Sequence, residues 1–341
     1  MIQPLSRRAL LKTLGAAALL PRFSVVSAGA ATATKPMRGV FIILNTPFTA
    51  SGAVDWDDLE REVAFVDRGG CAGVVWPQGS SGVTTLTREE RLRGMEVLAK
   101  AVQGTRVSLV LGVQGRDTAE MLDYTTRADA LGSDAVIAMP PTTGRTMEDY
   151  RAYFRALAGA TTRPAIVQTS GGAKDLFPSV DLIVELARAF PHMAYVKEES
   201  EPLVPRMRGE LAARPVMKGV FGASLGTGFL YEMRLGLDGV ITGMGMYADL
   251  MGRMWALHEQ GEHEAVRDAY SRFLLMRNLN ESIPGTDLYV MKMRGVFKTA
   301  VRRTSAPSGS APAALREVVP SPLEREEIEF RFAALKPYLS L

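Results

Sequence analysis

Eight short apolar runs, spaced regularly along this 341-residue chain, constrain its fold more than any other feature. They are rich in Val, Ile, Ala and Leu and alternate little with polar residues, which is typical of strands buried on both faces. The runs cover residues 39–48, 73–79, 107–113, 134–140, 164–170, 193–199, 216–223 and 239–245. Because helical segments separate them, the pattern predicts an α/β fold with a parallel sheet. Eight repeats predict a closed (β/α)8 TIM barrel, which typically takes about 250 residues.

The segments between the runs carry helix start signals, such as the capping-box spacing of Thr87 and Glu90. An open doubly wound sheet is the alternative architecture. Such a sheet usually has a glycine-rich turn after its first strand, and Asn-Thr-Pro-Phe at 45–48 does not resemble one. We therefore predict a barrel over 37–250. A C-terminal helical extension should follow over 251–341, with helical segments at 255–274 and 288–301 and a Ser/Pro/Ala-rich loop at 303–314.

The N-terminus resembles a twin-arginine transport signal. Ser-Arg-Arg-Ala-Leu-Leu-Lys at 6–12 is followed by an apolar stretch at 13–20 and by small residues at 28–30 that suit cleavage. A basic N-terminus without a targeting role is the alternative. We predict a signal peptide over 1–30, a flexible linker over 31–36, and a periplasmic or secreted protein. The apolar stretch is too short to span a bilayer, so we expect no stable membrane insertion.

Composition argues against several other functions. The net charge of +3 includes four basic residues in 1–30, and the remaining chain carries 36 basic and 37 acidic residues. A chain so balanced offers phosphates no basic face, and we expect no nucleic-acid partner. The only cysteine is Cys71, so an intrachain disulfide is impossible. The histidines, His192, His258 and His263, are not spaced as zinc ligands, and we expect no metal site.

One predicted strand ends in a lysine. In (β/α)8 barrels the reacting groups stand at the C-terminal ends of the strands, and the sixth run ends in Val-Lys-Glu-Glu at 196–199. Desolvation lowers the pKa of a buried lysine, and a neutral amine can attack a carbonyl carbon to form an iminium. Lys197 is therefore the candidate nucleophile. The alternative is a structural ion pair with Glu198, Glu199 or Glu201.

Small residues follow the second run. Gly-Ser-Ser-Gly at 79–82 could form a nest of backbone N–H groups that binds a carboxylate, with Ser80 and Ser81 as further donors. A plain turn is the alternative. Glu198 and Glu199 are adjacent in a strand, so their side chains should point to opposite sides. They would need a further acid to act as the carboxylate pair of a glycosidase.

In order and spacing, these pieces resemble the dihydrodipicolinate synthase and N-acetylneuraminate lyase family over about 37–301. The similar segments are Thr-Pro-Phe at 46–48, residues 79–91, Ala-Tyr-Val-Lys-Glu at 194–198 and Gly-Leu-Asp-Gly-Val-Ile at 236–241. The resemblance implies that Lys197 forms a Schiff base with pyruvate or a related 2-keto acid. It also implies that Ser80 and Ser81 hold the carboxylate and that Gly222 and Ile241 line the pocket. It implies no metal or organic cofactor, and assembly as a homodimer or homotetramer.

The chain departs from the family at several site positions. Gln168 stands where the family has a proton-shuttling tyrosine, and Thr143 lies in Pro-Thr-Thr where the family commonly has Pro-Tyr-Tyr. The family arginine aligns with Ala173, and the glutamate of its second-strand motif is Val83. Glutamine cannot ionise, so the usual proton relay is missing. Proton transfer would then involve water, Ser80, Thr143 or Glu199, with Gln168 as a hydrogen-bonding group.

Three functions follow as hypotheses. The first is an exported lyase or aldolase that uses Lys197 to cleave or hydrate a small 2-keto acid, pyruvate-like or sugar-derived. The second is a barrel of the same kind that captures a carbonyl acid with little or no catalysis. The third is a barrel hydrolase with carboxylate catalysis. Because the tyrosine is absent and the protein is expected outside the cytoplasm, we do not expect dihydrodipicolinate synthesis itself.

Overall fold

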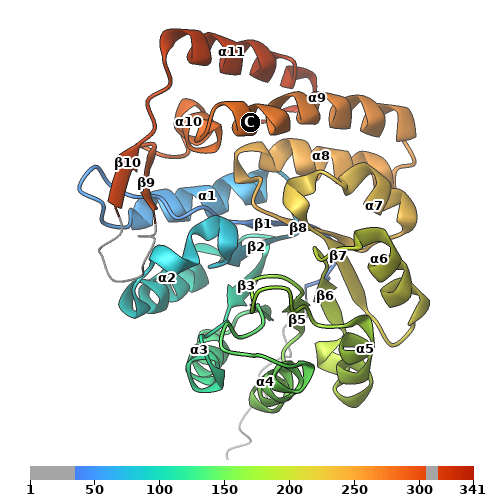
Figure 1. Ribbon diagram of the computed structural model, residues 1–341. Coiled ribbons are helices and arrows are strands. Elements are labelled where there is room, and N and C mark those ends of the chain that lie inside the picture. Colours follow the sequence, from blue (N-terminus) through green and yellow to red (C-terminus); the bar gives the residue numbers. More distant parts are fainter. Residues whose placement is uncertain (1–34, 305–313) are drawn as a thin grey trace, which may run out of the picture. The chain divides into compact units, whose positions relative to one another are not determined.

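The computed structural model describes residues 35–304 and 314–341, and the predicted signal peptide lies outside them. Eight parallel strands form a closed barrel in which each strand pairs with the next and β8 pairs with β1 (Figure 1). The predicted (β/α)8 fold is confirmed, and each strand is shorter than its apolar run. The strands are β1 Gly39–Ile43, β2 Gly73–Trp76, β3 Ser108–Gly112, β4 Ala135–Ala138, β5 Ala165–Gln168, β6 Tyr195–Lys197, β7 Gly219–Gly222 and β8 Gly239–Thr242.

Eight helices surround the strands (Figure 1). They are α1 Trp56–Arg68, α2 Arg88–Ala101, α3 Thr118–Ala130, α4 Met147–Ala160, α5 Val180–Ala189, α6 Leu203–Ala212, α7 Phe229–Leu235 and α8 Ala248–Glu259. Capping side chains set several helix starts, as expected from the sequence. The Thr87 hydroxyl accepts a hydrogen bond from the Glu90 N–H, and the Glu90 carboxylate accepts one from the Thr87 N–H, so α2 begins with the predicted capping box.

The two faces of the strands pack into different hydrophobic clusters. Side chains two residues apart, such as Phe41 and Ile43 of β1, pack with Ile166, Phe221 and Ile241 inside the barrel. The alternate side chains belong to the cluster shared with the helices. This alternation follows from the two-residue period of a strand. It therefore also places a residue two positions beyond the last interior residue of a strand on the same face, at the C-terminal mouth of the barrel.

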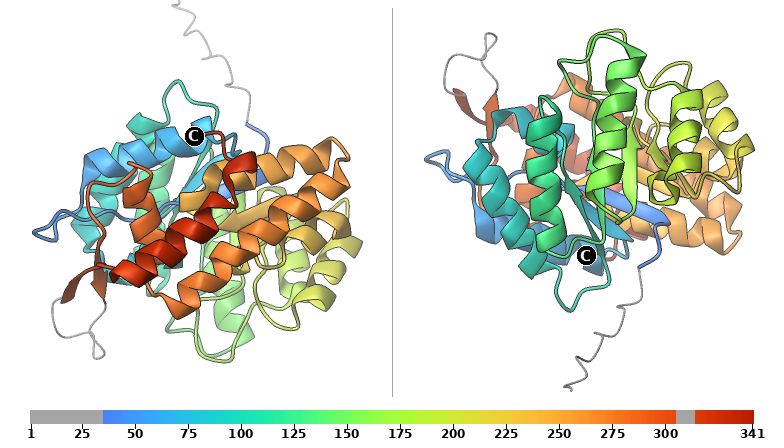
Figure 2. Two further views of the ribbon diagram at one scale, coloured as in Figure 1. Left: turned by 90° about the horizontal axis from the view of Figure 1, so that it is seen from above. Right: turned by 90° about the horizontal axis from the view of Figure 1, so that it is seen from below.

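The C-terminal part differs from the prediction in two respects. The predicted barrel boundary at residue 250 falls within α8, which packs on β1 and α1 and completes the ring of barrel helices. Two short antiparallel strands, β9 Val301–Thr304 and β10 Ala314–Glu317, flank the predicted Ser/Pro/Ala-rich loop, most of which (305–313) lies outside the described residues. The extension also contains three helices, as its predicted helical character requires: α9 His263–Ser282, α10 Thr286–Met293 and α11 Pro322–Ala333. Helices α9 and α11 lie side by side (Figure 2).

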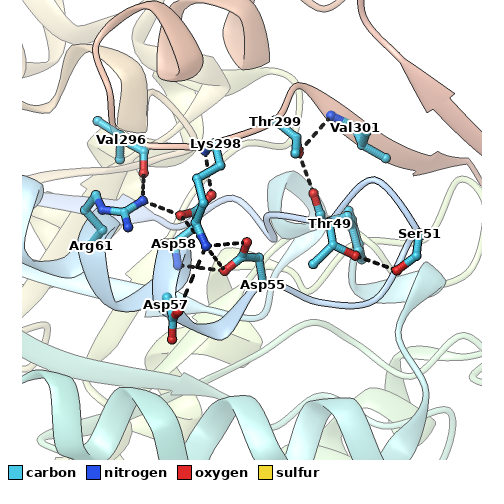
Figure 3. Close-up of polar contacts among 11 residues, drawn as sticks. Thr49, Ser51, Asp55, Asp57, Asp58, Arg61, Val296, Lys298, Thr299 and Val301 are labelled. Carbon is cyan, nitrogen blue, oxygen red and sulfur yellow. Dashed lines mark hydrogen bonds and ion pairs between the residues drawn. The ribbon is translucent and has the colours of Figure 1, made fainter.

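Polar contacts attach this extension to the start of α1. Lys298 Nζ lies 2.8 Å from Asp55 and 3.6 Å from Asp58, and the Lys298 N–H donates to Asp58 over 2.7 Å (Figure 3). Arg61 donates to the Val296 carbonyl over 3.0 Å. The Asp55 carboxylate also caps α1. It therefore both begins this helix and holds the chain segment that leads to β9.

Candidate active site

Lys197 and Gln168 lie side by side at the C-terminal ends of neighbouring strands. They are register partners in the β5–β6 pair, and each is two residues beyond a residue that packs inside the barrel, Tyr195 and Ile166. Both side chains therefore face the barrel interior at its mouth. Lys197 is 3% exposed and Gln168 is 4% exposed.

Glu199 connects these two side chains. Its Oε2 lies 2.7 Å from Lys197 Nζ, and its Oε1 accepts a hydrogen bond of 2.9 Å from Gln168 Nε2. The Ser170 hydroxyl also donates to Oε1. The ion-pair alternative for Lys197 is thus observed, with Glu199 as the partner. The pair nevertheless lies at the barrel mouth, where a reacting group of this fold would stand.

Burial governs the protonation of Lys197. Desolvation lowers the pKa of its ammonium, and the neighbouring Glu199 carboxylate opposes this shift without cancelling it. A lower pKa increases the fraction of neutral amine, which is the nucleophilic form. The direction of the shift is the one that Schiff-base chemistry requires.

Glu198 points to the opposite side of the chain, as the strand geometry predicts. It is fully buried toward α6, where Arg206 Nε donates to its Oε2 over 3.0 Å. The Thr169 hydroxyl donates to its Oε1 over 2.7 Å, and the Ser200 N–H over 2.8 Å. With these partners Glu198 supports the loop after β6, and it does not form an acid pair with Glu199.

The two predicted carboxylate-binding serines have different environments. The Ser81 hydroxyl donates to the Leu44 carbonyl over 2.6 Å, and its N–H donates to the Gln78 carbonyl over 3.0 Å. Ser81 is thus engaged in tying this loop to the end of β1. Ser80 is exposed and lies over the end of β8, because a Cβ atom on Gly243 would come within 2.3 Å of its Oγ. Ser80 is the hydroxyl of the pair that a ligand could reach.

Three further predicted residues are placed as follows. Thr143 is exposed, and its hydroxyl donates to the Arg116 carbonyl over 2.9 Å, in the loop after β3. Ile241 is fully buried inside the barrel. Gly222 ends β7, where a Cβ atom would lie 2.0 Å from a carboxylate oxygen of Glu232 on α7. The space beside Gly222 on the helix side is therefore filled by Glu232.

The sequence did not single out Ser170, which helps to hold Glu199. The signal was available, since Ser170 follows Gln168 by two residues and Glu199 follows Lys197 by two, the spacing that keeps side chains on one face. In residues 35–304 and 314–341 no group of three or more His, Cys, Asp or Glu is arranged to bind a metal ion. In the same residues no helix has the length and apolar content needed to cross a membrane.

Comparisons with known proteins agree with the motifs. A model of the dihydrodipicolinate synthetase family matches residues 36–311. The chain is 30% identical to the 4-hydroxy-tetrahydrodipicolinate synthase of Stenotrophomonas maltophilia (strain R551-3) over 233 residues, 67% of this chain and 76% of that protein. It is 27% identical to the enzyme of the same name from Chlorobium phaeobacteroides over 282 residues, 80% of this chain and 93% of that protein.

A solved structure has the same fold. It is the chloride-inhibited dihydrodipicolinate synthase of Acinetobacter baumannii complexed with pyruvate, with a TM-score of 0.75 at 21% identity. The match covers 88% of this chain and 99% of that one. The family resemblance of the motifs is confirmed: the chain belongs to the dihydrodipicolinate synthetase family and is a lyase of the aldolase type.

Proposed function

We propose that this protein is an exported lyase that forms a Schiff base between Lys197 and a small 2-keto acid. The observation that carries the proposal is the buried amine of Lys197 at the barrel mouth, whose pKa is lowered by desolvation. The A. baumannii structure of the same fold is complexed with pyruvate, which supports a pyruvate-like ligand. Ser80, which follows β2 and lies over the end of β8, would contribute to holding the ligand's carboxylate.

The amide of Gln168 favours a substrate that carries a hydroxyl group. Its Nε2 donates to Glu199 and to Ser170, whereas its buried Oε1 has no partner among the described residues. An unpaired buried acceptor is costly, by roughly 1–3 kcal/mol. A substrate hydroxyl that donates to Oε1 would remove this cost. A sugar-derived keto acid has such hydroxyls, and pyruvate has none.

The curated relatives are named for 4-hydroxy-tetrahydrodipicolinate synthesis, and we propose a different reaction for this chain. Gln168 replaces the ionisable tyrosine and Ala173 replaces the arginine that the family resemblance led us to expect. The same replacements favour the second candidate, a barrel that captures a carbonyl acid with little turnover. The hydrolase hypothesis has less support, because Glu198 and Glu199 face opposite sides.

Borohydride trapping tests the proposal. The full protein is incubated with pyruvate, 2-oxobutanoate or a 4-hydroxy-2-oxo acid, reduced with sodium borohydride and weighed by mass spectrometry. We expect one adduct, absent from Lys197→Ala and retained in Lys218→Ala, which removes an exposed lysine just before β7. Turnover of the hydroxy acid would identify the lyase, and trapping without turnover the binding protein. No adduct with any of the three acids would contradict both.

Export and assembly are part of the same proposal. Export is supported by the twin-arginine motif at 6–12, and cell fractionation of the full chain beside a variant with both arginines replaced by lysine would test it. A homodimer or homotetramer is proposed from the family resemblance, although one protein of this fold is described as a monomeric variant of dihydrodipicolinate synthase. Sedimentation of the mature chain would decide the assembly.

A further inference from the structure

We infer that Glu199 is the catalytic acid–base of this site and performs the proton transfers for which the family tyrosine is missing. This inference rests on the proposed function, because it needs a Schiff base on Lys197. It assigns a second catalytic residue to the site, with Gln168 and Ser170 as its positioning residues.

The geometry separates the roles of the two carboxylate oxygens. Oε1 is held by Gln168 Nε2 and by the Ser170 hydroxyl, whereas Oε2 faces Lys197 Nζ at 2.7 Å. The Glu199 N–H also donates to Thr169 Oγ1 over 3.0 Å. A carboxylate fixed at one oxygen keeps the other directed at the reacting nitrogen, and so at the carbons attached to it in the Schiff base.

The partial exposure of the Glu199 side chain also suits a group that exchanges protons with solvent. The Glu199 side chain is 19% exposed, whereas that of Lys197 is 4% exposed. The carboxylate thus reaches solvent on one side and the buried amine on the other. A group that must take a proton from a substrate and exchange it with water needs both contacts.

The other candidate groups are less suited to this role. The hydroxyls of Ser81 and Thr143 donate hydrogen bonds to the carbonyls of Leu44 and Arg116. Ser80 lies over the end of β8, where it is proposed to hold the carboxylate of the ligand. Glu198 lies on the helix side, paired with Arg206. Gln168 has no ionisable proton. Glu199 is therefore the ionisable group placed against the lysine.

The chemistry balances without a further reactant. Glu199 takes a proton from the Lys197 ammonium, and the free amine attacks C2 of pyruvate to give a carbinolamine. Glu199 returns the proton to the carbinolamine hydroxyl, which leaves as water, and a C2=N iminium remains. The carboxylate then removes a proton from C3. The C–H electron pair forms the C2=C3 bond, and the C2=N pair moves onto nitrogen to give the enamine.

The test separates imine formation from proton transfer. Wild type and Glu199→Gln are incubated with pyruvate in D2O; borohydride trapping reports the imine, and proton NMR reports exchange of the C3 protons. In Glu199→Gln we expect trapping to be slower but to reach a similar extent after long incubation, because an acid–base changes the rate of imine formation and not its equilibrium. Exchange should fall by about 10²–10⁴-fold, the usual contribution of a positioned acid–base. Glu201→Gln, with a neighbouring exposed acid, should behave as the wild type.

Each result has one interpretation. If the wild type gives no adduct, the proposed function fails, whatever Glu199 does. If Glu199→Gln traps pyruvate and exchanges C3 protons at the wild-type rate, or gives no adduct even after long incubation, the acid–base role is wrong. Should Glu199→Gln be unstable, Glu199→Ala with added formate provides the second measurement. Formate should restore exchange if a carboxylate is the base, and no restoration in a folded Glu199→Ala would overturn the inference.

Discussion

The buried carboxyl group of Glu232 makes the stability of this protein depend on pH. Glu232 lies in α7 and is 2% exposed, and neither carboxylate oxygen has a partner among the described residues. Gly222 and Gly228 leave room for it, since Cβ atoms there would approach its oxygens to 2.0 and 2.2 Å. Burial raises the pKa of Glu232 from 4.5 to about 7.

The sign and size of the effect follow from this shift. Because the folded pKa exceeds the unfolded pKa, the folded state binds the proton more tightly between about pH 4.5 and pH 7. The resulting stability is fully present below pH 4.5 and is lost as pH rises through 7. The shift corresponds to about 3 kcal/mol lost by pH 8.5. Glu232→Gln has nearly the same shape and no charge, so it should avoid this loss.

Thermal unfolding of the purified chain at pH 5 to 9 measures the prediction. Glu232→Gln should unfold near the wild-type temperature at pH 5 and on the order of 5 °C higher at pH 8.5. Other buried acids, such as Glu62 and Glu210, also have raised pKa values, so only the difference between the two proteins isolates Glu232. Glu60→Gln, at an exposed position of α1, is the matched control. Parallel pH profiles for wild type and Glu232→Gln would refute the reasoning.

Two other substitutions test the site and the C-terminal extension. Gln168→Tyr should slow the exchange of the C3 protons of pyruvate. The buried amide leaves no room for a tyrosine ring, so the ring would move Glu199 away from Lys197. Faster exchange would instead show that the missing tyrosine limits the rate. Arg294→Met should lower the free energy of unfolding by about 3–5 kcal/mol in urea titrations. Asp249 is fully buried and accepts hydrogen bonds from both terminal nitrogens of the Arg294 guanidinium, so the substitution leaves this carboxylate without its counter-charge. A loss of unfolding free energy below 1 kcal/mol would contradict the prediction.

The barrel was predictable because each of its strands carries its own signal. A run such as 107–113 is apolar on both faces, and the neighbouring caps mark where helices begin. The β9–β10 pair has no such signal. Its strands, Val-Arg-Arg-Thr and Ala-Leu-Arg-Glu, are polar, and distant partners stabilise them: Arg303 donates to both oxygens of Glu90 over 2.7 Å, and Val301 bridges Phe48. Contacts that join residues about 210 to 250 positions apart leave no local pattern.

The candidate site was predictable to a similar extent. Lys197 stood out because a charged group at a buried strand end requires an explanation. The engagement of Ser81 could not be foreseen, because it depends on the Leu44 carbonyl at the end of another strand. The position of Glu199 needed only the two-residue period, but its fixed orientation needed Ser170, an ordinary loop residue in the sequence.

The two adjacent glutamates show how the helix layer supports the mouth of the barrel. Thr169 Oγ1 donates to Glu198 and accepts from the Glu199 N–H, so one hydroxyl joins the buried carboxylate to the backbone of the catalytic candidate. Burial, with the Glu198 carboxylate nearby, raises the pKa of Glu210 to about 10, so Glu210 is neutral at pH 7. The neutral Glu210 therefore places no second anion beside the Glu198–Arg206 ion pair. The orientation of Glu199 thus also depends on a polar network on the helix side of the strands.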